Sequence, residues 1–255
     1  PLIRECLALI DVHQGLEIAH VSDLPGRTGL GTSSSFTVGL LHTLHAFRGD
    51  VVTPSQLAEE AILIERVRVA DAGGHQDQYA AAFGGLMRVD FSRKGAAVRR
   101  LDLPADRMAE LQSHLLLFYT GMEQSAEHIL HEQRSKVKKN TSSLLEMLAM
   151  VDQAQDLLCG NESLNALGDL LHQSWLRKKS LSSGITNGFV DEAYEAALAA
   201  GAHGGKLLGA GGRGFLLLLA PPATHRSIRD RLHKLAEVSF GFAPEGSRII
   251  FTSTD

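Results

Sequence analysis

Apolar residues recur along the first hundred positions in patterns that predict both helices and strands. Phe36, Leu40 and Leu44 follow the period of a helix with one buried face. Thr53 and Gln56 form a capping box around Pro54, a residue that suits the first helical turn. Helices are therefore predicted over residues 1–10, 33–48, 53–67 and 77–83, and strands over residues 17–21, 86–91 and 97–101.

The second half of the chain, from about residue 105, shows the same mixture of elements. Short apolar runs over residues 114–119 and 215–219 predict buried strands. Helices are predicted over residues 125–130, 144–159, 163–181, 189–200 and 225–238, and a last edge strand over residues 248–251. The whole pattern predicts an α+β protein with two lobes.

Glycines and hydroxyl residues cluster at the start of the helix predicted at residues 33–48. Gly29 and Gly31 are followed by an unbroken run of hydroxyl residues from Thr32 to Ser35. A glycine loop that opens a helix presents free N–H groups and the positive end of the helix dipole at one place, which favours an anion, most often phosphate. The hydroxyl groups could also bind a Mg²⁺ ion that accompanies the phosphate.

This loop differs from two widespread nucleotide-binding motifs. Gly26 and Gly31 have the glycine spacing of Walker A, but Thr32 stands where that motif requires lysine. Ser34 replaces the third glycine of the dinucleotide-binding fingerprint. That fingerprint does occur within residues 209–214, but a predicted strand follows its glycines where a helix is required. The sequence therefore predicts neither a P-loop nor an NAD site.

Composition narrows the class of protein. The chain has 255 residues, 44% of them hydrophobic and 21% charged, which is ordinary for a globular protein. The formal net charge of −4 gives no basic field for nucleic acid or an anionic membrane, so neither is expected as a partner. Cys6 and Cys159 form no disulfide or metal framework, and we expect a cytoplasmic location. No signal peptide or apolar run of about 18 residues is visible.

Three segments, in this order along the chain, resemble the motifs of the GHMP kinases, a superfamily that includes galactokinase, homoserine kinase and mevalonate kinase. They are residues 25–36 (P-x-x-x-G-L-G-T-S-S-S-F), residues 73–86 and residues 206–215. The resemblance implies a two-lobed α+β fold: an ATP-binding, ribosomal-S5-like domain over residues 1–104 and a ferredoxin-like domain over residues 105–255. The superfamily's first strands have no counterpart here, so the first domain is expected to be truncated at its start.

Finer features are similar to one branch of that superfamily. They lie at residues 33–41, 75–80, 117–121 and 178–185. The branch transfers the γ-phosphoryl group of ATP to the anomeric hydroxyl of D-glycero-D-manno-heptose 7-phosphate, giving the 1,7-bisphosphate. The resemblance thus implies ATP, Mg²⁺ and a sugar phosphate as ligands, and it allows a homodimer. Two other readings remain: a kinase of a fucose- or arabinose-like sugar, and a non-catalytic relative or inactive fragment that binds nucleotide or sugar.

The resemblance also implies roles for particular residues. Asp77 corresponds to the general base, with Asp71 as a local competitor, and Ser33 and Glu65 correspond to the Mg²⁺ ligands. The triphosphate loop is Gly29, Leu30, Gly31, Thr32, Ser33, Ser34 and Ser35, and the third motif contributes Gly209, Ala210, Gly211, Gly212 and Gly214. Lys178, Lys179 and Arg213 are candidates for binding the substrate phosphate, and Arg27 is a further cation near the first loop.

Several of these assignments have structural alternatives. Glu65 could be a solvated charge on a helix face, and Lys178 and Lys179 could be the cationic end of a surface helix. The family usually has glycine where Arg213 stands, so this residue could either reach a phosphate or crowd the loop. The branch usually has lysine where His75 stands; histidine would hold Asp77 ionised only when protonated. His128 and His131 lack a further ligand cluster, so no zinc site is expected.

Overall fold

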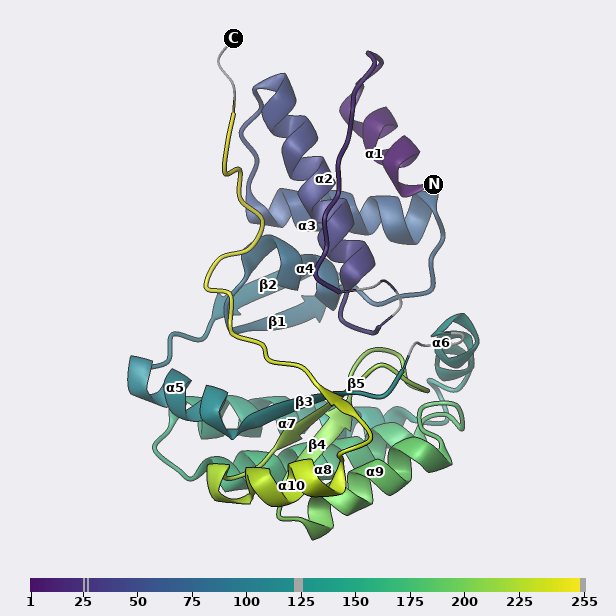
Figure 1. The fold of residues 1–255 in the computed structure, drawn as a ribbon. Coiled ribbons are helices and arrows are strands. Elements are labelled where there is room, and N and C mark those ends of the chain that lie inside the picture. The colour runs from purple at the N-terminus through teal and green to yellow at the C-terminus, as the bar shows by residue number, and fades with distance from the viewer. Residues whose placement is uncertain (25, 27, 122–125, 253–255) are drawn as a thin grey trace. The chain divides into compact units, whose positions relative to one another are not determined.

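The computed structural model describes residues 1–24, 26, 28–121 and 126–252. These residues form two compact units (Figure 1). The first unit comprises Pro1–Gly26, Gly31–Arg100 and the described residues from Ala243 on, and the second comprises residues 28–30 and Leu101–Phe242. The chain thus passes from the second unit back to the first between Leu30 and Gly31. The domain limits inferred from sequence, 1–104 and 105–255, stay a prediction.

The described part of the first unit contains four α-helices, one π-helical turn and a hairpin. The helices are α1 (Leu2–Ile10), α2 (Thr32–Arg48), α3 (Pro54–Ile62) and α4 (Gln76–Phe83), and the antiparallel hairpin consists of β1 (Met87–Ser92) and β2 (Gly95–Arg100). Their apolar faces bury a common core that includes Cys6, Leu41, Leu57 and Ile64. Burial raises the pKa of the Cys6 thiol to about 12, so this residue serves as an apolar core side chain.

The segment after Thr53 begins as the sequence predicts but changes its helical form halfway. The Thr53 hydroxyl accepts a hydrogen bond from the Gln56 amide at 3.2 Å, and Pro54 occupies the first turn. The α-helix ends at Ile62, and the chain continues as a π-helical turn, η1 (Leu63–Arg68). Such wider turns are frequent at functional sites. This turn carries Glu65.

The second unit contains a four-stranded antiparallel sheet. Its strands lie in the order β4 (Gly204–Leu207), β5 (Phe215–Leu219), β3 (Leu115–Tyr119) and β6 (Ala236–Glu237). The strand that comes first in sequence lies between the third and the fourth, which is the ferredoxin-like arrangement expected from the sequence. The helices are α5 (Ala105–His114), α6 (Ala126–Ser135), α7 (Thr141–Cys159), α8 (Leu164–Ser180), α9 (Gly188–Ala199) and α10 (His225–Arg231), with a short turn η2 (Pro222–Thr224).

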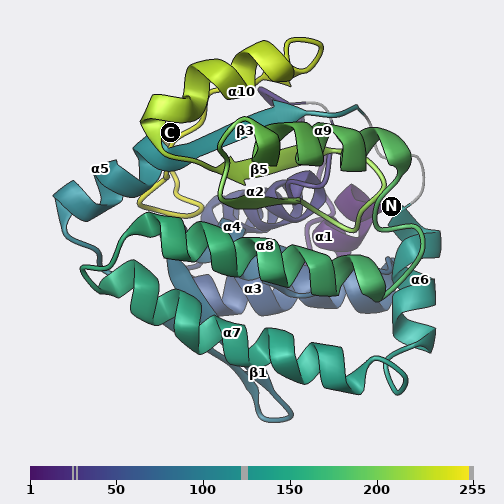
Figure 2. The same ribbon diagram turned by 90° about the horizontal axis from the view of Figure 1, so that it is seen from below.

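Alternating residues of this sheet point to one set of helices. Phe118, Leu216 and Leu218 are buried in a core shared with Trp175 of α8 and Tyr194 of α9. Figure 2 shows α8 and α9 lying across the sheet. Trp175, predicted to be a core residue, is 1% exposed. The apolar runs of β3 and β5 therefore form a packed interior, as their sequences predict.

Two predicted strands are wrong. Residues 17–21 and 248–251 are extended without a hydrogen-bonded neighbour strand. Val21 is 92% exposed and Ile250 is 86% exposed, so neither segment has the buried partner that strand formation needs. The helix predicted over residues 225–238 ends at Arg231, because Ala236 and Glu237 pair with β3 instead. Helix α5 and strand β4 were not predicted from the sequence.

Among the described residues, no helix combines the length and the apolar character that crossing a bilayer requires.

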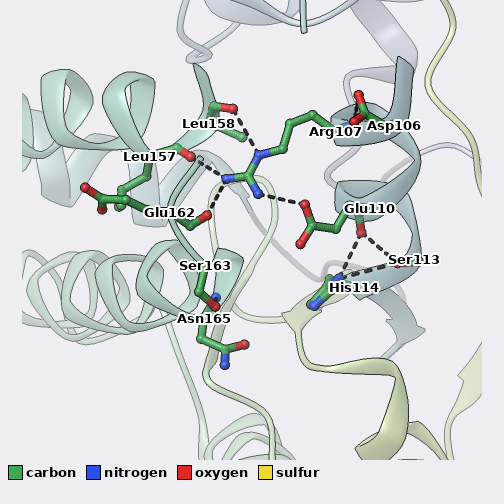
Figure 3. A network of polar contacts seen from close by, with 10 residues as sticks. All are labelled: Asp106, Arg107, Glu110, Ser113, His114, Leu157, Leu158, Glu162, Ser163 and Asn165. Atoms are coloured by element: carbon green, nitrogen blue, oxygen red, sulfur yellow. Dashed lines mark hydrogen bonds and ion pairs between the residues drawn. The ribbon is translucent and has the colours of Figure 1, made fainter. Parts of the chain in front are cut away.

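Arg107 fastens α5 to the end of α7 (Figure 3). Its guanidinium donates to the carbonyl oxygens of Leu157, Leu158 and Glu162 at 2.7, 3.3 and 2.8 Å, and it pairs with Glu110 at 2.7 Å. Helix α7 has no basic residue in its own last turn. Arg107 therefore satisfies carbonyl groups that a helix C-terminus leaves without partners.

We expect Arg107→Met to lower the free energy of unfolding by about 1–3 kcal/mol, because it leaves part-buried carbonyl groups without a donor. Denaturant unfolding followed by circular dichroism measures this. The matched control is Arg226→Met, since Arg226 is exposed in α10, and its effect should stay within about 0.5 kcal/mol. Equal losses in the two variants would contradict the role of Arg107.

Candidate active site

The N-terminus of α2 carries the predicted phosphate loop. Gly31 is the N-cap residue with φ +70°, and the first intrahelical bond runs from the Ser35 amide to the Gly31 carbonyl at 2.9 Å. The amides of Thr32, Ser33 and Ser34 therefore have no acceptor within the helix. They lie at the positive end of the helix dipole, where an anion is favoured, so phosphate binding at this loop stays a prediction.

Gly31 also lies against Asp77. A β-carbon added to Gly31 would be 3.0 Å from both Cβ and Cγ of Asp77. Asp77 lies in the first turn of α4, so the packing brings the start of α2 and the predicted base together within the first unit. Only glycine suits this position, because the left-handed backbone and the close approach both exclude a side chain.

Glu65 is the centre of a buried polar network. Its side chain is 1% exposed, and its Oε2 accepts hydrogen bonds from Ser34 Oγ at 3.0 Å and Gln78 Nε2 at 2.8 Å. Arg66 pairs with the same oxygen at 3.2 Å. Glu65 is therefore not a solvated helix charge, and it contacts Ser34 rather than the exposed Ser33.

Sequence reasoning missed Gln78 and Arg66 in this network. Gln78 is 0% exposed although it is polar, and it adjoins Asp77 on α4. Arg66 adjoins Glu65 on η1. Each residue adjoins a predicted functional carboxylate in the sequence, and that adjacency was the only signal available. Which carboxylate each side chain contacts depends on the faces of α4 and η1 from which it projects.

The oxygens around Glu65 fit a magnesium ion. Oε1 of Glu65 is buried and has no hydrogen-bond partner among the residues that the structure describes. A carboxylate oxygen beside serine hydroxyls is the donor chemistry that Mg²⁺ prefers. Within the described residues, no group of three or more His, Cys, Asp and Glu side chains could hold a metal by itself. An ion here would therefore take most of its ligands from phosphate and water.

Burial raises the pKa of Asp77 above its ordinary value of 3.8. The positive charge of Arg66 and a hydrogen bond with Gln76 act in the opposite direction. His75, the cation that the sequence suggested for this role, caps α4, and its ring lies edge-on to Phe91 with centroids 6.1 Å apart. In this structure Arg66 is thus the cation that favours the ionised form of Asp77.

The second unit holds the third glycine motif against the other end of the phosphate loop. A β-carbon on Gly209 would lie 2.6 Å from Cα of Gly29, and one on Gly214 would lie 2.6 Å from the Thr28 carbonyl oxygen. The two backbones approach more closely than side chains permit. The structure therefore brings together two motifs that are about 180 residues apart in the sequence.

The candidate cations of the second unit differ in their surroundings. Lys178 Nζ donates to the Gly209 carbonyl at 2.7 Å, whereas Lys179 Nζ pairs with Asp191 at 3.0 Å. The Arg213 guanidinium lies 5.4 Å from the centroid of the Phe189 ring, in cation–π geometry. Arg213 has no positive φ, so it does not strain the loop. Arg27 lies outside the described residues.

Comparison with known proteins defines the class to which this fold and site belong. The model of the GHMP kinases N terminal domain matches residues 2–85, and that of the GHMP kinases C terminal domain matches residues 150–237. D-glycero-alpha-D-manno-heptose 7-phosphate kinase of Campylobacter jejuni is 30% identical over 88% of this chain and 68% of its own length. The chain belongs to the GHMP kinases, and within that family it is a sugar kinase.

Further relatives agree on this fold but differ in substrate. The bifunctional fucokinase/GDP-fucose pyrophosphorylase of Arabidopsis thaliana is 27% identical over 88% of this chain and 22% of its own length. A D-glycero-D-manno-heptose 1-phosphate kinase from Bacteroides thetaiotaomicron has a TM-score of 0.70 at 26% identity, covering 96% of this chain and 72% of that one. A phosphomevalonate kinase of Streptococcus pneumoniae has a TM-score of 0.72 at 17% identity, over 93% and 79% of the two chains, a likeness of fold alone.

We expect Gly31→Ala to lower kcat by about a hundredfold, because its β-carbon would displace Asp77. Steady-state kinetics with ATP and the best acceptor measure this. Gly39→Ala in the middle of the same helix is the matched control, since a β-carbon there meets nothing within 4 Å. That control should keep full activity and gain about 0.5–1 kcal/mol of stability. Full activity of Gly31→Ala would contradict the proposed contact.

The raised pKa of Asp77 gives two coupled expectations. The base must be ionised, so kcat/KM should fall toward acid with a midpoint above pH 3.8. Because folding raises this pKa, ionised Asp77 disfavours the folded state, and stability falls as pH rises from 3.8 through the folded pKa. Asp77→Asn should therefore abolish turnover yet unfold at the same or a higher temperature at pH 7, unlike the exposed control Asp230→Asn, which should match wild type. Retained turnover would exclude Asp77 as the base.

Proposed function

We propose that this protein transfers the γ-phosphoryl group of ATP to the anomeric hydroxyl of D-glycero-D-manno-heptose 7-phosphate. The contact of Gly31 with Asp77 carries the proposal, because it sets a carboxylate beside an anion-binding helix terminus. The heptose 7-phosphate kinase of Campylobacter jejuni, at 30% identity, supports the choice of sugar.

The proposed mechanism assigns a separate task to each part of the site. The oxygen of the sugar hydroxyl attacks the γ-phosphorus, the bond from that phosphorus to the β,γ-bridging oxygen breaks, and ADP leaves. Asp77 accepts the hydroxyl proton, and the free amides of Thr32, Ser33 and Ser34 bind phosphate oxygens. Glu65 with Ser33 or Ser34 would hold Mg²⁺, which when bound neutralises phosphate charge.

The substrate's own phosphate needs a second cationic site. Lys178 and Arg213 both lie at the loop of residues 209–214, and among the described residues no carboxylate pairs with Arg213. Its guanidinium stays exposed while Phe189 fixes its direction. These properties favour Arg213 over Lys179, whose charge Asp191 already balances, and Lys178 is a second candidate because its Nζ lies on the Gly209 carbonyl of the same loop.

An acceptor panel tests the function. The protein is incubated with Mg·ATP and, separately, with D-glycero-D-manno-heptose 7-phosphate, the corresponding 1-phosphate, the free heptose, L-fucose and mevalonate. ADP release is measured, and ³¹P NMR identifies the product. We expect turnover with the 7-phosphate and a new phosphorus signal coupled to the anomeric proton. Turnover with L-fucose alone would support the second reading, and ATP binding without turnover would support a non-catalytic relative.

Three variants test the cationic site. Arg213→Gly and Lys178→Met should each raise KM for the sugar phosphate by about tenfold or more, because each removes a charge-assisted hydrogen bond, while KM for ATP changes little. Lys179→Met is the matched control and should leave both values near wild type. Equal loss in all three variants would indicate a general effect of positive charge rather than a defined phosphate site.

A further inference from the structure

A cation that the mechanism above does not use pairs with the Glu65 carboxylate. Arg66 follows Glu65 on η1, and its side chain is only 10% exposed. A guanidinium is rarely buried unless its donors are satisfied. Its partners therefore indicate what it holds.

The three sides of this guanidinium contact three separate groups. Nε donates to the Gly74 carbonyl at 2.8 Å, Nη2 lies 3.2 Å from Glu65 Oε2, and Nη1 lies 3.2 Å from Asp71 Oδ2, an ion pair in which Nη1 makes no hydrogen bond among the described residues. Asp71 and Gly74 belong to the segment that joins η1 to α4. Arg66 therefore ties the Glu65 carboxylate to that connecting segment.

The connecting segment is shaped around this contact. A β-carbon on Gly73 would lie 2.4–2.6 Å from the guanidinium, so the backbone at Gly73 rests directly on it. Ala70 has φ +59°, a conformation that a residue with a β-carbon adopts only when its surroundings enforce it. The hydrogen bond from the Asp71 amide to the Glu65 carbonyl at 2.8 Å closes the end of η1 around Ala70, and the Arg66 contacts on Asp71 and Gly74 hold the residues that follow.

The segment ends at the start of α4. His75 is the N-cap residue and Asp77 lies in the first turn, three residues after the Gly74 carbonyl that Arg66 holds. Arg66 therefore adds a second tie between η1 and the start of α4, beside the direct hydrogen bond from Gln78 of α4 to Glu65. Glu65 comes before the segment that Arg66 contacts, and Asp77 comes after it.

We propose that Arg66 is a positioning residue that fixes Glu65 and Asp77 relative to each other by clamping the segment between them. The expected effect on kcat rests on the proposed function, whereas the contacts of Arg66 do not. The alternative is that Arg66 supplies a compensating charge to buried Glu65 and nothing more. Lysine separates the two: it keeps the charge but has no planar fork of donors to reach three groups at once.

Two variants and one control test the proposal kinetically. Arg66→Lys should lower kcat by about a hundredfold with KM for ATP and for the sugar changed by less than about threefold, because the reacting groups are displaced rather than removed. Arg66→Met should lose at least as much. Arg68→Met is the control, since Arg68 lies on the same turn and contacts Glu5 of α1 instead. Wild-type kcat in Arg66→Lys would overturn the proposal.

A second measurement does not depend on activity. Hydrogen exchange of the amides of residues 71–76, followed by mass spectrometry, should be at least about tenfold faster in Arg66→Lys, with the rest of the chain and the unfolding temperature near wild type. Unchanged exchange there would overturn the clamp even if the enzyme has a different acceptor. If wild type turns over no acceptor but exchange rises as expected, the clamp stands and the proposed function fails.

Discussion

The candidate site of this molecule depends on the packing of a backbone without a side chain against a carboxylate. Gly31 ends one segment and begins α2, and the space that a β-carbon would fill is taken by Asp77. This single approach gives the N-terminus of α2, the proposed phosphate site, and Asp77, the proposed base, a common location. Helix α4, the segment before it and the buried network behind it all serve to keep Asp77 there.

That network shows how the first unit accommodates buried charge. Glu65 is almost fully buried, yet two hydrogen bonds and the ion pair with Arg66 all meet at Oε2, while Oε1 has no hydrogen-bond partner among the described residues. A buried carboxylate with one satisfied and one free oxygen is costly for stability unless a cation completes it. Arg66 already supplies one positive charge at Oε2, and Oε1 is the atom at which the Mg²⁺ ion of the proposed function would be held.

In the second unit, a close approach is made by backbone atoms alone. Its loop of residues 209–214 approaches Gly29 at distances that only glycine allows, and Arg213, the one bulky residue in the loop, directs its side chain away onto Phe189. A family position that is usually glycine thus holds arginine without strain, because its φ stays in the ordinary range. The substitution adds a cation at the loop while the backbone path remains that of a glycine-rich motif.

The sequence by itself determined the local chemistry: the helix that follows Gly31, the capping box at Thr53, the apolar strands β3 and β5, and the motif residues that identify the GHMP kinases. These features depend on near neighbours in the chain. Only the tertiary structure decided that Ser34 rather than Ser33 faces Glu65, that Arg66 rather than His75 provides the charge near Asp77, and that residues 17–21 and 248–251 form no strands. The physical reason is that a helix face, a buried ion pair and a strand partner are each set by a segment distant in sequence, here by a π-helical turn whose extra residue no periodic pattern reveals.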